Sequence, residues 1–252
     1  NVFFIECCFD IRYFHFFIWT FIMFLLIALG ALSVSAFATD LPGTGFSLSS
    51  NLTYTSEYIY RGSSVSGGDP AIQGGFDLSH TGGLYVGTWG SNVDWSGTGL
   101  EMRFFGGYRS EIANMMHYDI SAILYRYPGA TGTNDNWKMV EYAGSVSKGF
   151  GPLHASLSLN YSPDYFNSLG KSYYTKLHCS MPISDPLAVS AAIGRTNVSD
   201  DSSLDSYTDY LASLSYTFKN YILAVTYTDT TLPTDGYSQA GPAAVVSLTA
   251  SI

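Results

Sequence analysis

The chain has 252 residues and a formal net charge of -9, and only 12% of its residues are charged whereas 16% are aromatic. This acidic balance argues against nucleic acid or anionic lipid headgroups as electrostatic partners. The length suits one large all-β domain, and a soluble protein would carry about twice this fraction of charged residues.

Residues 1–38 are predicted to be a leader. The stretch from residue 13 to residue 38 has no charged side chain and ends in Ala36-Phe37-Ala38, a small-x-small signal-peptidase site. We therefore expect cleavage after Ala38, although the apolar run is also long enough for a retained membrane anchor. Two interpretations of residues 1–22 remain open: the sequence is a fragment, or these residues are upstream read-through of a gene that starts near Met23. We assign no function to them.

From residue 39 to residue 252 the sequence falls into alternating apolar and polar runs. There are about a dozen, each roughly nine to eleven residues long, which is the length of a tilted strand that crosses a bilayer. In the first run the even positions from Leu48 to Tyr60 are mostly apolar, Tyr58 included, and the odd positions from Asn51 to Arg61 are mostly polar. Because side chains alternate across a strand, each run has one apolar and one polar face.

The connections between these runs are expected to alternate in length. The long ones are Arg61–Asp69, Asn92–Gly99, Tyr127–Asn136, Ser162–Gly170, Arg195–Ser206 and Asp229–Gly241. The short ones are His80–Gly83, Lys148–Pro152, Met181–Pro186 and Phe218–Tyr221. The link Arg109–His117 breaks this rule by being longer. Long loops on one rim and short turns on the other are typical of an outer-membrane barrel with both termini on the short-turn side.

These patterns predict a closed antiparallel transmembrane β-barrel of about 12 strands, with short periplasmic turns and longer extracellular loops. A soluble sandwich would show the same alternation with its apolar faces turned inward. The leader, the loop asymmetry and the low charge favour the membrane. There the sheet must close, because an unpaired edge would leave backbone groups without hydrogen bonds.

If the polar faces line a lumen, a set of polar and charged side chains becomes the candidate pore wall. These are Glu57, Arg61, Gln73, Asp77, Glu101, Arg103, Asp119, Glu141, Lys176 and Asp209. A wall with charges of both signs produces a transverse field that orients polar solutes. In the alternative, the charges pair across the interior and bulky inner residues such as Tyr125, Tyr174 and Trp89 seal the bore. The glycine-rich segment from Arg61 to Pro70 is a candidate constriction, but a flexible surface turn is the favoured interpretation.

The sequence predicts neither an enzyme nor a bound cofactor. It lacks G-x-S-x-G, H-E-x-x-H and Cys/His metal spacing. Cys179 is the one cysteine after the leader, so no intramolecular disulfide is expected within residues 39–252. The histidines His80, His117, His154 and His178 are scattered and are interpreted as interfacial or lumen-lining. An outer-membrane hydrolase assembled from distant strands is the weakest alternative.

The segment YIYRGSSVSGGDPAIQGGFDLSHTGGLYVGTWGSNVDW, at residues 58–95, resembles the signature of the TorF-type porin family, a group of conserved hypothetical Gram-negative outer-membrane proteins. The similarity continues through residues 99–111, 118–129, 141–147 and 160–166, weakens, and returns at 208–218 and 224–230. Arg103 departs from the neutral or acidic residue that the family tends to carry, and Ile252 departs from the Phe that usually ends such barrels. The resemblance implies a porin in the outer membrane and names no substrate.

The sequence therefore predicts an outer-membrane porin-like channel for passive diffusion of small polar solutes or ions. The alternative is a non-conducting structural or adhesive barrel that acts through its surface loops. The expected partners are outer-membrane lipid and lipopolysaccharide, the barrel-assembly machinery during biogenesis and small polar solutes. No nucleic acid is expected among them.

Overall fold

The computed structural model describes residues 39–95, 97–112, 116–130, 138–199, 204–233 and 240–251. The predicted leader, with its cleavage site after Ala38, lies outside these ranges. Within them, no helix is both long enough and apolar enough to cross a membrane.

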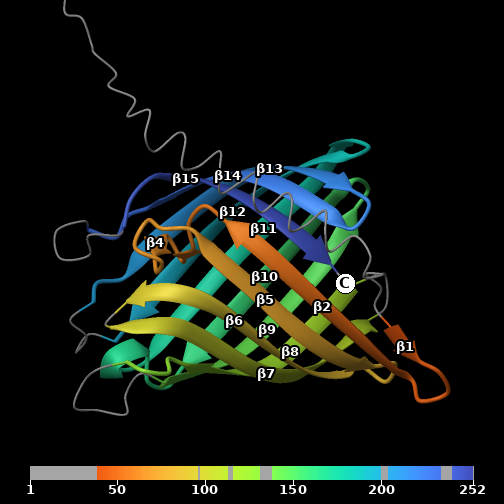
Figure 1. Ribbon diagram of the computed structural model, residues 1–252, viewed down its shortest axis with the longest axis horizontal. Coiled ribbons are helices and arrows are strands. Elements are labelled where there is room, and N and C mark those ends of the chain that lie inside the picture. The colour runs from red at the N-terminus through yellow and green to blue at the C-terminus, as the bar shows by residue number, and fades with distance from the viewer. Residues whose placement is uncertain are drawn as a thin grey trace, which may run out of the picture. The chain divides into compact units, whose positions relative to one another are not determined.

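Twelve long antiparallel strands form one closed sheet in the described part of the chain (Figure 1). They are β2 (Phe46–Thr55), β5 (Ala71–His80), β6 (Leu84–Trp95), β7 (Thr98–Ile112), β8 (Met116–Arg126), β9 (Lys138–Phe150), β10 (Leu153–Ser162), β11 (Ser172–Ser184), β12 (Leu187–Val198), β13 (Tyr207–Phe218), β14 (Tyr221–Thr230) and β15 (Ala243–Ser251). From β5 to β15 each strand pairs with the next, and β2 closes the barrel by pairing with both β5 and β15. The short strand β1 (Thr39–Leu41) adds to β2. The predicted closed antiparallel barrel of about 12 strands is confirmed.

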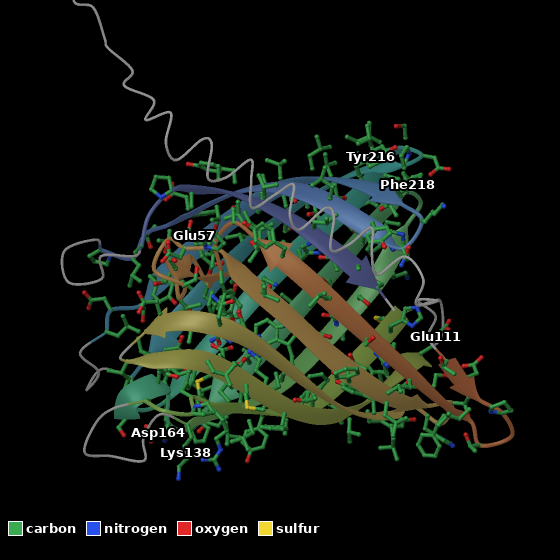
Figure 2. The ribbon with its side chains drawn as sticks, in the orientation of Figure 1. Glu57, Glu111, Lys138, Asp164, Tyr216 and Phe218 are labelled. Carbon is green, nitrogen blue, oxygen red and sulfur yellow. The ribbon has the colours of Figure 1, made fainter. Side chains whose placement is uncertain are left out.

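The two ends of the barrel differ in the length of their links. The strands run obliquely between these ends (Figure 1). At the loop end, the long links are residues 56–70, 127–137, 163–171, 199–206 and 231–242. At the turn end, the links are residues 81–83, 113–115, 151–152, 185–186 and 219–220. Figure 2 shows Lys138 and Asp164 at the loop end and Glu111, Tyr216 and Phe218 at the turn end.

One predicted long loop, Asn92–Gly99, is wrong, because most of it is strand. β6 continues to Trp95 and β7 begins at Thr98, which leaves a tight link of two residues at the loop end. Asn92 and Asp94 are exposed and Val93 between them is buried. Strand alternation therefore continues past the apolar band, where polar side chains on the outer face meet water and resemble a loop in the sequence.

The predicted longer link Arg109–His117 is also wrong, because most of it is strand. β7 extends to Ile112 and β8 begins at Met116, so only residues 113–115 connect the two strands. Arg109 pairs with Asp119 in the register of these strands, and both occupy the polar, inward-facing set of positions. Polar side chains on the inner face of these strands therefore resemble a connection in the sequence.

Large apolar side chains cover the outside of the barrel. Phe76, Leu84 and Val86 are 60%, 63% and 57% exposed, whereas Glu141 on the inner face is 0% exposed. Exposed apolar area on this scale in a soluble protein would drive association, and in a barrel it faces lipid. The apolar faces therefore do not form the interior of a soluble sandwich.

Aromatic side chains gather on the outer wall near both ends. At the loop end they are Tyr54, Tyr142, Tyr161, Tyr173, Tyr210 and Tyr227. At the turn end they are Phe46, Tyr108, Tyr118, Phe150, Tyr216 and Phe218. Two aromatic girdles on either side of an apolar band are the pattern of a barrel that spans a bilayer.

Candidate functional site

Most of the predicted pore-wall residues occupy inward-facing positions on long strands. These are Gln73 and Asp77 on β5, Glu101 and Arg103 on β7, Asp119 on β8, Glu141 on β9, Lys176 on β11 and Asp209 on β13. Their apolar neighbours in sequence, such as Ile72 and Phe104, are exposed on the outer wall. Glu57 and Arg61 reach the interior by another route, because β2 ends at Thr55.

A small hairpin folds back into the loop end of the barrel. Strands β3 (Ile59–Tyr60) and β4 (Ser63–Ser64) pair antiparallel, and Arg61 and Gly62 join them. These two residues have φ values of 49° and 79°. Two consecutive positive φ values are the mark of a type I′ turn, which suits a two-residue hairpin link. We call residues 57–66 the inner hairpin. Figure 2 labels its first residue, Glu57, at the loop end of the barrel.

The expected surface turn is wrong for this part of the segment. Tyr58, Ser64 and Ser66 are buried, and the backbone N–H of Val65 donates to the carbonyl of Tyr58 at 2.9 Å. Gly62 lies so close to the wall that a Cβ there would be 2.6 Å from the Cβ of Thr230 on β14. Glycine supplies the turn, but burial of the neighbouring aromatic rings decides where the segment lies.

Tyr58 and Tyr60 belong to the candidate functional site, and the sequence pattern misplaced both of them. Alternation assigned both rings to the apolar outer face of the first strand, but the chain leaves the wall after Thr55. The ring of Tyr60 instead lies 6.3 Å from that of Tyr125, and the ring of Tyr58 lies 5.6 Å from that of Trp89. The one available signal was Gly62, which permits a reversal so soon after the strand.

Arg61 crosses the interior and binds the wall at Glu141. Its Nη2 donates to both carboxylate oxygens, at 2.7 and 3.0 Å. Tyr125 Oη and Asn160 Nδ2 donate to the same carboxylate at 3.0 and 3.2 Å. The Arg61 and Glu141 side chains are 6% and 1% exposed. Arginine is unusual at positive φ, and this buried ion pair holds it there.

A second carboxylate network lies on β7. Arg103 Nε donates to Glu101 Oε1 at 2.7 Å, and Nη2 forms an ion pair with the same oxygen, also at 2.7 Å. Tyr58 Oη donates to Glu101 at 3.1 Å and Tyr127 Oη donates at 2.8 Å. Arg103 Nη2 also contacts the Tyr58 hydroxyl. This network joins the inner hairpin to the wall, because Tyr58 belongs to the hairpin and the other partners do not.

Aromatic rings enclose both guanidinium groups. The Cζ atom of Arg61 lies 4.1 Å from the ring centroid of Tyr174 and 4.8 Å from that of Tyr60. The Cζ atom of Arg103 lies 4.4 Å from the Trp89 ring. Cation–π contacts of this kind strengthen when water is excluded. The loop end of the interior is therefore a packed polar and aromatic constriction.

The loop before β11 adds to this constriction. Its 3-10 helix, η2 (Phe166–Ser168), carries Phe166 against the rings of Tyr60 and Tyr125, at 5.9 and 5.8 Å. Tyr165 is buried beside it. Burial raises the pKa of the Tyr165 hydroxyl, since its ionised form would lose hydration. The Tyr165 side chain therefore stays uncharged over the ordinary pH range.

A cavity of about 540 Å³ lies against the inner hairpin. Among the predicted pore-wall residues, those that line it are Glu57, Arg61, Gln73, Arg103, Lys176 and Asp209. Hydroxyl side chains from the strands, among them Thr53, Ser158 and Thr226, complete much of the lining. The structure thus brings these candidates into one chamber, and Glu101 and Glu141 lie behind its two arginines.

The remaining candidates lie nearer the turn end. The Tyr85 hydroxyl donates its one hydrogen to the Asp119 carboxylate, with both carboxylate oxygens 2.8 Å from Oη, and Asp77 lies on the same inner face. A second cavity, of about 610 Å³, is lined there by His117, His154 and His178. In the described ranges, no cluster of His, Cys, Asp and Glu is arranged to hold a metal ion.

Three solved structures have similar folds. The KdgM porin in complex with disordered oligogalacturonate has a TM-score of 0.58 and 9% identity, and the match covers 81% of this chain and 99% of that chain. The NanC porin has a TM-score of 0.54 and 8% identity, with 80% of this chain and 97% of that chain covered. The COG4313 outer membrane channel from Pseudomonas putida F1 has a TM-score of 0.50 and 14% identity, with 84% of this chain and 98% of that chain covered. At such low identity the similarity concerns the fold. No curated protein sequence matches the chain.

The strand-rich part of the sequence has a family relationship of its own. Residues 39–251 match the Gcw_chp family model, which is described as a bacterial protein of unknown function, and the chain therefore belongs to this family.

Proposed function

We propose that the protein is an outer-membrane porin-like channel that passes small polar solutes or ions passively, without covalent chemistry. The observation that carries this proposal is a polar interior that side chains do not fill, with cavities of about 540 and 610 Å³ inside an apolar outer wall. In small barrels that serve only as structure, side chains fill the interior.

The proposal includes a location and an orientation. The apolar band and its two aromatic girdles support insertion in a bilayer, and long loops face outward in outer-membrane barrels. The loop end is therefore extracellular and the turn end periplasmic. Outer-membrane lipid, lipopolysaccharide and the barrel-assembly machinery are the proposed partners, and residues 1–38 are proposed to be removed during export.

The finer family label is also a proposal. The segment at residues 58–95, which resembles the TorF-type porins, contains the inner hairpin except for Glu57, and also the cavity-lining residues Gln73 and Trp89. The structurally similar KdgM and NanC proteins are named as porins. A channel role within the TorF type agrees with both observations.

A second function has its own supporting observation. The inner hairpin, its two arginine–glutamate pairs and the Phe166 ring cluster occupy the loop end of the interior. This arrangement favours a non-conducting structural or adhesive barrel that acts through its surface loops. The two functions differ in one property, which is whether solutes cross.

Osmotic swelling of liposomes tests the choice between them. Residues 39–252 are refolded into liposomes that contain a trapped impermeant polymer, and the vesicles are diluted into isosmotic solutions of glycerol, glucose or sucrose. We expect swelling that slows as the solute becomes larger. Vesicles that contain heat-modifiable, β-rich protein and swell no faster than empty ones would exclude the channel and favour the structural barrel.

A further inference from the structure

The cavity against the inner hairpin has the size of a small-molecule site. Its volume of about 540 Å³ corresponds to roughly 18 water molecules at about 30 Å³ each, and it falls within the range of about 300–1,000 Å³ for ligand pockets. The inner hairpin forms one wall, since the residues from Glu57 to Gly62 all contribute to the lining. The inference below rests on the proposed channel function and names the solute class.

Three buried polar atoms in this lining have no hydrogen-bond partner among the described residues. They are the hydroxyl oxygen of Tyr60, Nη1 of Arg61, which is a donor, and Oδ2 of Asp209, which is an acceptor. The Arg61 side chain is 6% exposed, and Asp209 is also 6% exposed. Buried polar groups in folded proteins nearly always have a partner, so each atom has capacity for one further hydrogen bond.

Both side chains are fixed by their other contacts. Arg61 is held by Glu141 through Nη2, and Asp209 accepts a hydrogen bond from the Tyr174 hydroxyl at 3.1 Å through Oδ1. The Tyr174 ring that orients Asp209 also stacks with the Arg61 guanidinium. A donor and an acceptor are therefore positioned around one aromatic ring. A Cβ at Gly62, the residue after Arg61, would lie 3.0 Å from the Cβ of Asp209.

The charges around the cavity nearly cancel. Arg61, Arg103 and Lys176 carry three positive charges, and Glu57 and Asp209 carry two negative charges within the lining. The glutamates paired with the two arginines add two more negative charges. A local balance of three against four gives no strong preference for a free anion or a free cation. A hydroxyl group, which donates and accepts, matches both the unpartnered donor on Arg61 and the unpartnered acceptor on Asp209.

The rest of the lining has the same chemistry. Hydroxyl and amide side chains predominate among the polar residues, and they are Thr53, Thr55, Gln73, Ser158, Asn160, Thr226, Thr228 and Ser247. The ring of Trp89 is also part of the lining. Hydroxyls and amides hydrogen-bond to polyols in either direction, and an aromatic ring packs against their C–H groups.

We propose that this cavity is a binding site for a neutral polyhydroxylated solute, in which one hydroxyl accepts from Arg61 Nη1 and a hydroxyl donates to Asp209 Oδ2. The solute enters the cavity on its way through the channel. Binding at this point gives the channel a preference for polyols over other uncharged molecules of the same size.

Isothermal titration of refolded residues 39–252 in detergent tests the proposal without requiring conduction. The probes are glucose, gluconate and glucosamine, which share a six-carbon skeleton and differ in charge. We expect saturable binding of glucose that Asp209→Asn weakens at least about tenfold, the effect of losing a hydrogen bond to a charged group. Arg61→Lys, which keeps the charge but removes Nη1, is a second variant with the same expected direction.

The control variant is Asp164→Asn, an exposed carboxyl at the loop end (Figure 2), which should bind glucose as the unaltered protein does. Tighter binding of gluconate or glucosamine than of glucose would overturn the neutral class. Glucose binding that both variants leave intact, in protein that remains heat-modifiable, would overturn the site. Conduction without glucose binding refutes this inference alone, and glucose binding without conduction refutes the channel alone.

Discussion

At the scale of single residues, the two interior glutamates are the fixed points of the constriction. Glu141 is 0% exposed and accepts hydrogen bonds from Arg61, Tyr125 and Asn160. A buried carboxylate needs such partners, because its hydration is lost. The arginine needs Glu141 equally, so the pair stabilises the inner hairpin only while both charges are present.

Replacing Glu141 by Gln should leave the Arg61 charge buried and uncompensated. We expect the free energy of unfolding to fall by about 3 kcal/mol. The measurement is urea-induced unfolding of protein refolded in lipid vesicles, followed by tryptophan fluorescence. Glu111→Gln, which changes an exposed glutamate at the turn end, should have an effect near zero. Equal effects of the two substitutions would contradict the role of the ion pair.

Gly62→Ala should displace the inner hairpin from the wall. A Cβ at this position would lie 2.6 Å from the Cβ of Thr230, and φ is +79°. Gly68 provides a matched control, since its φ is +84° and nothing lies within 4 Å of a Cβ there. We expect Gly62→Ala to raise the conductance of single channels in a planar bilayer and Gly68→Ala to leave it unchanged. Unchanged conductance in both variants would show that the hairpin does not limit flow.

At the scale of the strands, alternation decides which face meets lipid. Val146 and Ser145 are neighbours on β9; Val146 is 44% exposed on the outer wall, and Ser145 pairs with the inward-facing Asp119. Arginine on the lipid face near the middle of a strand costs about 2–4 kcal/mol, whereas arginine at Ser145 would lie near a carboxylate. The same substitution at two neighbouring positions of a strand should therefore differ in its effect on stability.

Val146→Arg is expected to lower the free energy of unfolding by about 2–4 kcal/mol, and Ser145→Arg to change it little. Reversible unfolding in lipid vesicles measures both. Similar destabilisation by the two variants, or a larger effect at Ser145, would contradict the assignment of faces.

The sequence was sufficient to predict the strands, their number and their faces, because alternation is a local property of the chain. Glu101, Arg103 and Glu141 were assigned to the interior by parity alone. The ends of the strands were predicted less well, because β6 continues past the lipid band, where polar residues such as Asn92 and Asp94 face water on the outer wall.

The inner hairpin was beyond prediction from local pattern for a different reason. Its position depends on contacts between segments distant in sequence, such as Arg61 with Glu141 and Gly62 with Thr230. Alternation through Tyr58 and Tyr60 imitated a continued strand. Nothing in the spacing of these residues distinguishes a ring that faces lipid from a ring packed against Trp89 or Tyr125.

At the scale of the whole barrel, the two ends of the interior are built differently. The loop end holds the inner hairpin, two ion pairs and a ring cluster, whereas the turn end contains the cavity lined by His117, His154 and His178. Twelve strands enclose a bore between those of side-chain-filled small barrels and open porins. We therefore predict a narrow channel whose resistance is concentrated at the loop end.

Single-channel conductance in a planar bilayer tests this claim most directly, with residues 39–252 compared with a variant in which a short Gly-Ser link replaces residues 57–66. We predict small discrete steps for the unaltered chain and larger steps for the variant. Silence from both, in protein whose heat-modifiability shows a folded barrel, would contradict a channel, and equal steps would contradict the inner hairpin as its constriction.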